Sequence, residues 1–141
     1  MAGIINTLKS LVDRHQNQVR NRKFVEAVMA SMALLALADG EISFAELMAR
    51  DYFLDHVQQL QIIEPNEAAE LFRYYADTIK DDIKVGQDKV WNLVSTFCGD
   101  DILAPLLLNI CKAIAEADTN YSEQEHTIII KLTKILGLKN Y

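Results

Sequence analysis

The sequence predicts an all-α protein in which about seven helices form one domain over residues 1–141, around two central apolar helices. Three observations support this prediction. The chain has only two prolines and five glycines, so long segments contain no helix breaker. Apolar residues recur at helical spacing and do not alternate as in a half-buried strand. A helix–corner–helix pattern occurs twice, and half of the residues are hydrophobic, which is enough for a core.

The repeated pattern lies at residues 36–47 and 115–125. In each copy an apolar helix runs into an acidic corner, and the next helix begins with a serine followed three positions later by a glutamate. Equivalent positions are 79 residues apart: Asp39 and Asp118, Ser43 and Ser122, Glu46 and Glu125. Two copies at this spacing predict an internal pseudo-two-fold repeat rather than a solenoid, with the two apolar helices side by side.

The apolar periodicity predicts seven helices, at residues 4–19, 24–38, 43–61, 65–79, 90–97, 102–117 and 122–136. Two of them, 24–38 and 102–117, are apolar on nearly every side and should therefore be central. Both are shorter than the roughly 20 residues that span a bilayer, so we interpret them as core helices and expect no direct membrane span.

Local signals set the ends of the first four helices. Gly40 can take the left-handed conformation that ends a helix. Ser43 and Glu46 are expected to form a capping box that starts the next one. Pro65 suits a first helical turn. Residues 81–86, which begin with two aspartates and end with a glycine, are interpreted as a connection.

Similar signals set the ends of the later helices. Residues 99–101, Gly-Asp-Asp, are expected to cap the second central helix. Pro105 is tolerated because it falls in or near the first turn. Ser122 and Glu125 form the second expected capping box, and Gly137 stops the last helix.

The charge is distributed unevenly along the chain. Residues 1–23 carry a net charge of +4 and residues 24–141 a net charge of −10. An acidic body disfavours nucleic acid and favours cations or basic partners. The basic amphipathic helix expected within residues 1–20 has two interpretations: its apolar stripe packs on the domain, or its basic face meets an acidic membrane or partner.

The two cysteines and the chain start indicate the compartment. Cys98 and Cys111 form no Cys-x-x-Cys pair and are expected to be reduced, buried thiols. No signal peptide is visible. We therefore expect a protein of the cytoplasm, or one peripheral to the inner face of the membrane.

The acids of the two corners are candidate metal ligands. Each aspartate follows the C-terminal end of a helix, where backbone carbonyls already concentrate partial negative charge. Each glutamate lies seven positions later, and a tight corner could fold it back toward the aspartate. Carboxylates are hard ligands suited to Ca²⁺ or Mg²⁺, and Zn²⁺ is a further candidate. The candidates are Asp39, Glu46, Asp118 and Glu125, with Glu41 and Asn120 secondary.

Two other interpretations of these acids remain open. The glutamates are also explained by capping boxes and the aspartates by turns, with no ligand at all. Alternatively, the acids form a patch that binds a protein partner without metal. No phosphate-binding loop, nucleophile elbow or Ser/His/Asp set is present, so the sequence indicates no catalysed reaction.

At these residues the chain resembles the tellurite-resistance TerB family. The resemblance rests on Ala38-Asp39-Gly40-Glu41-Ile42-Ser43 with Glu46, Ala117-Asp118 with Glu125, Asp82-Ile83-Lys84-Val85-Gly86, and Asn21-Arg22-Lys23-Phe24. It implies an all-α fold of about seven helices with a pseudo-two-fold core. It also implies a cytoplasmic bacterial protein linked to tellurite resistance and general stress response.

The family resemblance further implies action without catalysis. Members associate with other tellurium-resistance or stress proteins, one of them membrane-integral, and a negatively charged patch is the suspected interaction or metal site. Carried over to this chain, the patch comprises Asp39, Glu46, Asp118 and Glu125. The second corner departs from the family pattern, because Thr119-Asn120 stands where glycine is usual. That corner should be stiffer, and the two corners need not bind metal equally.

The expected function is therefore that of a non-enzymatic stress protein whose acidic corners bind a divalent cation, a protein partner, or both. The alternative is a structural scaffold or adaptor, without metal, that is attached to a membrane partner through the basic N-terminal helix. Neither the identity of the partner nor the oligomeric state follows from the sequence.

Overall fold

The computed structural model describes residues 10, 22–38, 44–59, 64–116 and 122–138, and for residues 45, 46, 54, 56–59 and 65 the backbone only. Six helices and no strand are found in these ranges. They are α3 (Arg22–Ala36), α4 (Phe44–Gln59), α5 (Pro65–Asp81), α6 (Ile83–Ser95), α7 (Leu103–Ala115) and α8 (Glu123–Ile135). The all-α prediction is confirmed. The count is six within these ranges, against about seven expected for the whole chain; the helix expected at residues 4–19 lies outside them, apart from Ser10.

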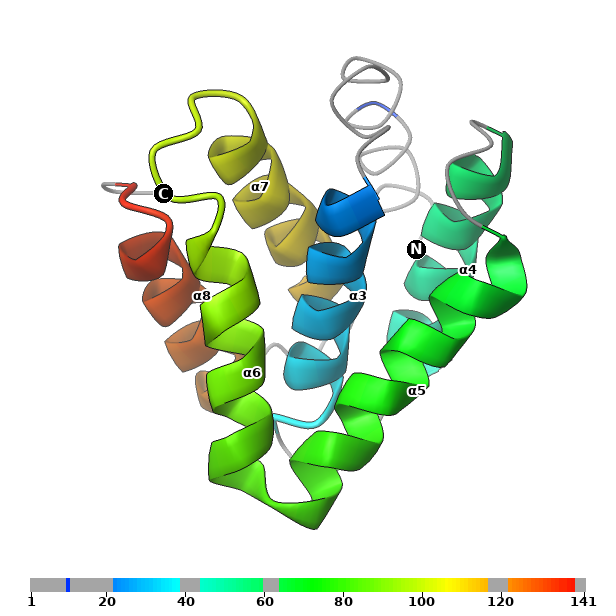
Figure 1. Ribbon diagram of the computed structural model, residues 1–141, viewed down its shortest axis with the longest axis horizontal. Coiled ribbons are helices and arrows are strands. Elements are labelled where there is room, and N and C mark those ends of the chain that lie inside the picture. The colour runs from blue at the N-terminus through cyan, green and yellow to red at the C-terminus, as the bar shows by residue number, and fades with distance from the viewer. Residues whose placement is uncertain (1–9, 11–21, 39–43, 60–63, 117–121, 139–141) are drawn as a thin grey trace.

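Helix α3 is the centre of the molecule (Figure 1). It contacts each of the other five helices. Every residue from Phe24 to Ala36 is buried except Glu26, as expected for a helix that is apolar on nearly every side. Glu26 is half-buried, and its carboxylate accepts a hydrogen bond of 2.7 Å from the Tyr75 hydroxyl of α5. The central position predicted for this helix is confirmed.

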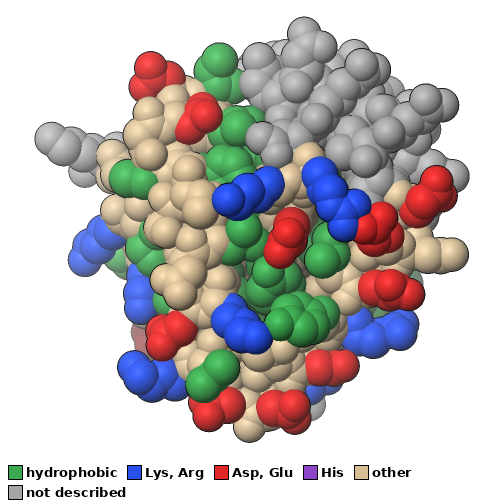
Figure 2. All heavy atoms as spheres, in the orientation of Figure 1, with side chains coloured by type: hydrophobic (Ala, Val, Ile, Leu, Met, Phe, Trp, Pro, Cys, Tyr) green, Lys and Arg blue, Asp and Glu red, His purple; other side chains and the backbone are tan. Residues whose placement is uncertain are grey.

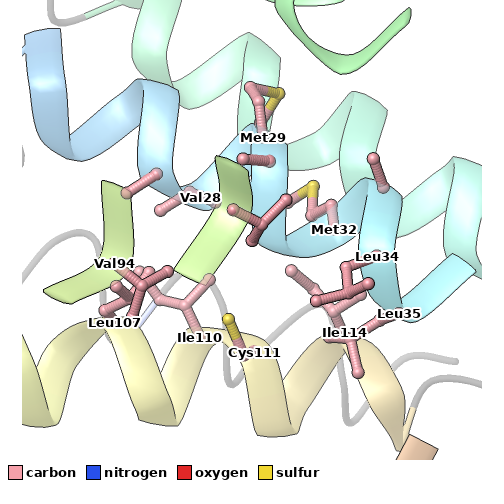
Figure 3. Packing of buried hydrophobic residues seen from close by; sticks show 14 of the residues in the cluster. Val28, Met29, Met32, Leu34, Leu35, Val94, Leu107, Ile110, Cys111 and Ile114 are labelled. Carbon is pink, nitrogen blue, oxygen red and sulfur yellow. The ribbon is translucent and has the colours of Figure 1, made fainter. Parts of the chain in front are cut away.

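Helix α7 is the second central helix and packs directly against α3 (Figure 3). Leu107, Ile110 and Ile114 face Val28 and Leu35 across the interface. All five of these side chains are at most 1% exposed. Close packing of this kind makes the interface sensitive to the loss of even a few methyl groups.

The helix ends repeat with the same spacing as the sequence. Helix α3 ends at Ala36 and α7 at Ala115, so their last residues are 79 positions apart. Helix α4 begins at Phe44 and α8 at Glu123, and their first residues are also 79 positions apart. Each central helix also contacts both of the helices that follow the corners, α4 and α8. These contacts are what a pseudo-two-fold axis between α3 and α7 requires.

The connection between α5 and α6 is shorter than the sequence suggests. Residues 81–86 were expected to be a loop, but Asp82 alone separates the two helices, and that expectation is wrong. The side chain of Asp82 accepts a hydrogen bond of 3.1 Å from the Val85 backbone N–H, so it caps α6. Residues 83–86 therefore form the first turn of α6 rather than a connection.

Gly86 explains how α5 and α6 can cross so closely after this turn. A Cβ atom at Gly86 would lie 2.5 Å from the Cα atom of Ile79 and 2.7 Å from its backbone nitrogen. Only a residue without a side chain fits there. The glycine is thus required by helix–helix packing and not by an unusual backbone angle.

The caps expected for α7 and α8 are present. Asp100 Oδ1 accepts from the backbone N–H groups of Ile102, at 2.9 Å, and Leu103, at 2.7 Å. At the start of α8, Ser122 and Glu125 form the predicted capping box. The first capping box, at Ser43 and Glu46, lies outside what the structure describes.

The two cysteines differ in exposure. Cys111 is fully buried, as expected, and burial raises the pKa of its thiol to about 12. Cys98 is exposed, so the expectation that it is buried is wrong. It lies in the turn after α6, beside Gly137, rather than on a helix face that points inward. None of the helices in the described ranges is both long and apolar enough to cross a bilayer.

Candidate functional site

The structure describes only part of the predicted acidic site. Glu125 is described in full, and Glu46 lies in α4 with only its backbone described. Asp39, Glu41, Asp118 and Asn120 fall outside the described residues. The proposal that these carboxylates share one site therefore stays a prediction.

Glu125 is a buried carboxylate at the start of α8. Glu125 is only 2% exposed to solvent. Its Oε1 atom accepts hydrogen bonds from the Ser122 hydroxyl, at 3.2 Å, and the Ser122 backbone N–H, at 3.4 Å. In return, the Glu125 backbone N–H donates to the Ser122 hydroxyl at 3.1 Å. The positive end of the helix dipole also favours a negative charge here. Capping is thus a role that Glu125 performs, whatever else it binds.

The two corners adjoin the same end of the bundle. Helices α3 and α7 run in the same direction, so Ala36 and Ala115 lie at one end (Figure 1). The close-up agrees, because Val28 lies near Leu107 at one end of the interface and Leu35 near Ile114 at the other (Figure 3). The last backbone carbonyls of both helices, which carry partial negative charge, therefore point toward one end of the molecule.

A pocket of about 310 Å³ opens at this end, and we call it the corner pocket. Its lining comes from α3 and the turn after it, α5, α6 and α8: Leu34, Leu37, Ala38, Ile79, Ile83, Gln87, Gln124, Thr127 and Ile128. Ala38 immediately precedes the first corner and Gln124 follows the second, so the pocket joins residues that flank both. Its lining is mostly aliphatic, and the polar members are uncharged.

Charged residues neighbour the lining of the corner pocket in the sequence but are not part of that lining. Exposed acids flank it in sequence at Asp82, Asp88 and Glu123, and the exposed cations Lys80 and Lys84 flank it as well. Figure 2 shows acidic side chains along this edge of the molecule, with lysine and hydrophobic side chains among them. Ile83 is 64% exposed, so apolar surface continues from the pocket to the tip of the α5–α6 hairpin.

A metal site is not formed by the described side chains alone. Among them, no group of three or more histidine, cysteine or carboxylate side chains lies close enough to hold an ion. The donor chemistry of the predicted corner acids suits Ca²⁺ or Mg²⁺ best, because both ions prefer carboxylate and carbonyl oxygens. Zn²⁺ would also accept carboxylates, but it is more often bound with histidine or cysteine.

Sequence reasoning missed two features of this region. The pocket residues come from four separate helices and share no motif, so only the packing brings them together. The Glu26–Tyr75 hydrogen bond was also missed, although one sign was available: Glu26 is the single charged residue in the apolar part of α3. Burial, with the adjacent Glu26 carboxylate, raises the pKa of Tyr75 well above its usual range.

Comparison with known proteins gives a family match. No curated protein and no solved structure is significantly similar to the chain. The sequence model of the family described as "Tellurite resistance protein TerB" matches residues 25–141, which is most of the chain and includes both corners. The all-α fold and the repeat agree with what the resemblance to this family implies. The chain therefore belongs to the TerB family.

Proposed function

We propose that this protein is a non-enzymatic binding protein of tellurite resistance and stress response, whose two acidic corners bind a divalent cation, a basic protein partner, or both. It would act in the cytoplasm or at the inner face of the membrane, with other tellurium-resistance or stress proteins as partners. The supporting observation is the geometry of the repeat. Two helices with identically spaced ends finish at one end of the bundle, and each is followed by an aspartate.

Asp39 and Asp118 lie three residues beyond the ends of α3 and α7. Three residues extend the chain by at most about 10 Å, so each aspartate stays near its helix end. The partial negative charge of the helix ends disfavours two more carboxylates unless a cation or a basic group compensates. This electrostatic cost is the physical reason to expect a cationic ligand.

The test is thermal unfolding of the full chain after removal of metal with EDTA. Addition of Ca²⁺ or Mg²⁺ at 100 times the Kd should stabilise the protein by about 2.7 kcal/mol, because a ligand bound only to the folded state shifts the equilibrium. Zn²⁺ is assayed in parallel. Asp39→Asn combined with Asp118→Asn should abolish the shift.

The matched control replaces two exposed aspartates elsewhere, Asp77→Asn with Asp101→Asn, which makes the same change in net charge. The control variant should keep the cation-dependent shift. An unmodified protein whose melting temperature is the same with and without each cation would rule out the metal part of the proposal. The partner-binding part would then remain, because an acidic patch needs no metal to bind a basic protein.

One observation favours a second function, that of an adaptor held at a membrane partner by its N-terminal helix. Residues 1–23 carry a net charge of +4 and precede the family match, which starts at residue 25. Replacing Lys9, Arg14 and Arg20 with glutamine should reduce sedimentation with vesicles that contain anionic lipid, since each basic residue contributes about 1 kcal/mol at such a surface. Equal sedimentation of both proteins would exclude this function.

A further inference from the structure

The corner pocket has an apolar inner part and a polar rim. Three of its lining residues are at most 9% exposed: Leu34, Ile79 and Ile128. Of its polar members, Gln124 and Thr127 are exposed and Gln87 is half-buried. A molecule that fills the pocket therefore buries an apolar portion against aliphatic side chains and keeps its polar end near the solvent.

The polar side chains of the rim have unused hydrogen-bonding capacity. The Thr127 hydroxyl donates to the Glu123 carbonyl of its own helix at 2.9 Å, but its oxygen can still accept. Among the described residues, no hydrogen bond of the Gln87 or Gln124 side-chain amide is found. A side-chain amide has one carbonyl oxygen and one NH2 group, so each glutamine can bind either a donor or an acceptor on a ligand.

The lining also selects the charge of the ligand. None of the residues that line the pocket is an acid, a lysine, an arginine or a histidine. A carboxylate or an ammonium group in the pocket would lose part of its hydration without gaining an opposite charge from the lining. An uncharged polar group pays a smaller desolvation cost, which the glutamine amides can offset with hydrogen bonds. The lining therefore favours an uncharged ligand.

The size of the pocket sets the size of that ligand. An apolar cavity of about 150 Å³ holds one molecule of benzene. The corner pocket, at about 310 Å³, has room for roughly twice as many non-hydrogen atoms, about ten to twelve. A single aliphatic side chain of a protein partner is smaller than this and has no polar end, so it would leave part of the pocket unfilled and both amides unused.

We propose that the corner pocket binds a small uncharged amphiphile, with an aliphatic chain against Leu34, Ile79 and Ile128 and an amide or hydroxyl head at Gln87 and Gln124. Burial of the chain supplies most of the affinity. The head supplies the specificity, because the glutamine amides gain hydrogen bonds only from a ligand with a polar end. The site involves no cation, so this proposal is independent of the metal proposal and is tested in EDTA.

The first experiment titrates octanamide into the full chain and follows the backbone and side-chain amide signals by NMR. We expect saturable shifts at the pocket residues, including the side-chain NH2 signals of Gln87 and Gln124. Octanoate and octylammonium have the same chain with a charged head, and each should bind at least about tenfold more weakly. Hexanamide is two methylenes shorter and should also bind about tenfold more weakly, since each buried methylene contributes about fourfold.

Two variants of the protein test whether the pocket is the site. Gln87→Leu removes one amide and should weaken octanamide binding about fivefold. Thr127→Phe fills the pocket from an exposed position on α8 and should weaken binding by about tenfold or more. Asn92→Leu is the matched control for the first variant, because it makes the same change from amide to leucine at an exposed position of α6 outside the lining. It should leave the affinity unchanged, and circular dichroism verifies that each variant is folded.

Several results would overturn the proposal. Octanamide that gives no saturable shifts up to its solubility limit would do so, as would shifts confined to residues outside the pocket. Octanoate or octylammonium that binds as tightly as octanamide would contradict the assignment to uncharged ligands. An affinity that is the same in Thr127→Phe as in the unmodified protein would refute the site. Equal effects of Gln87→Leu and Asn92→Leu would refute the role of the glutamine amide.

Discussion

Gly86→Ala tests the close crossing of α5 and α6. The substitution has two opposite effects on the free energy of unfolding. Alanine favours a helix over glycine by about 1 kcal/mol, so an unhindered site would be stabilised. At Gly86, however, the new Cβ would lie 2.5 Å from the Ile79 Cα atom and 2.7 Å from the Ile79 nitrogen. Unstrained carbon atoms approach to about 3.5 Å, so the helices must separate by about 1 Å.

The clash should exceed the gain in helix propensity. Overpacking a well-packed core costs about 1–3 kcal/mol when side chains can adjust. Here the nearest atom and one of the next two belong to the backbone of α5, which cannot rotate away, so the cost should lie at or above the upper end of that range. We therefore expect Gly86→Ala to lower the free energy of unfolding by about 2 kcal/mol after the propensity gain is included.

Urea unfolding followed by circular dichroism and by Trp91 fluorescence measures this change. Asn92→Ala is the control on the same helix, because it raises helix propensity at an exposed position and should be neutral or slightly stabilising. Combining Gly86→Ala with Ile79→Ala should not restore stability, since the shortest contact is with the Ile79 backbone. A Gly86→Ala protein as stable as the unmodified chain, or more stable, would refute the reasoning.

Three further predictions concern the cap, the polar contact and the core. Ser122→Ala removes the capping box around buried Glu125 and should cost about 1–2 kcal/mol in urea unfolding. Tyr75→Phe removes the hydrogen bond to Glu26 and should cost about 1–2 kcal/mol at pH 7. Because the pKa of Tyr75 is raised by burial, its stabilisation is complete below the unfolded value of about 10 and is lost as the pH rises beyond it, which unfolding at pH 8–11 measures. Leu107→Ala opens a cavity at the α3–α7 interface and should cost about 2–5 kcal/mol in calorimetry.

Each of these three predictions has a result that contradicts it. Ser95 is an exposed serine near the end of α6, so a loss for Ser95→Ala as large as that for Ser122→Ala would argue against a specific cap. The advantage of Tyr75 over phenylalanine should shrink above pH 10, and a constant difference would disprove the assigned titration. A cost below about 1 kcal/mol for Leu107→Ala would mean that the interface collapses around the lost side chain.

The central helices and their caps were predictable because each depends on local sequence. A helix with apolar residues on all sides is stable only when other parts of the protein surround it, and α3 and α7 are buried in this way. The Ser122–Glu125 capping box is a spacing of three residues and needs no tertiary information. The repeat was predictable for the same reason, because the corner residues in the sequence indicate where one helix ends and the next begins.

The other features depend on packing between distant residues. Asp82 was read as part of a loop because two aspartates near a glycine are typical of turns, yet its side chain caps α6. Gly86 acquires its role from Ile79, which only the crossing of two helices places beside it. The corner pocket likewise has no sequence signature. For the carboxylates, the sequence predicts identity and spacing, while their relative positions depend on corners outside the described residues.

The contrast between Cys98 and Cys111 gives the chain an internal reporter of its own folding. The exposed Cys98 thiol can be alkylated in the native state, whereas Cys111 has no solvent access and its raised pKa leaves almost no thiolate. Mass spectrometry after brief labelling should count one modified sulfur in the native protein and two after unfolding. The rate at which the second sulfur becomes reactive then measures how often α3 and α7 separate, without any added probe.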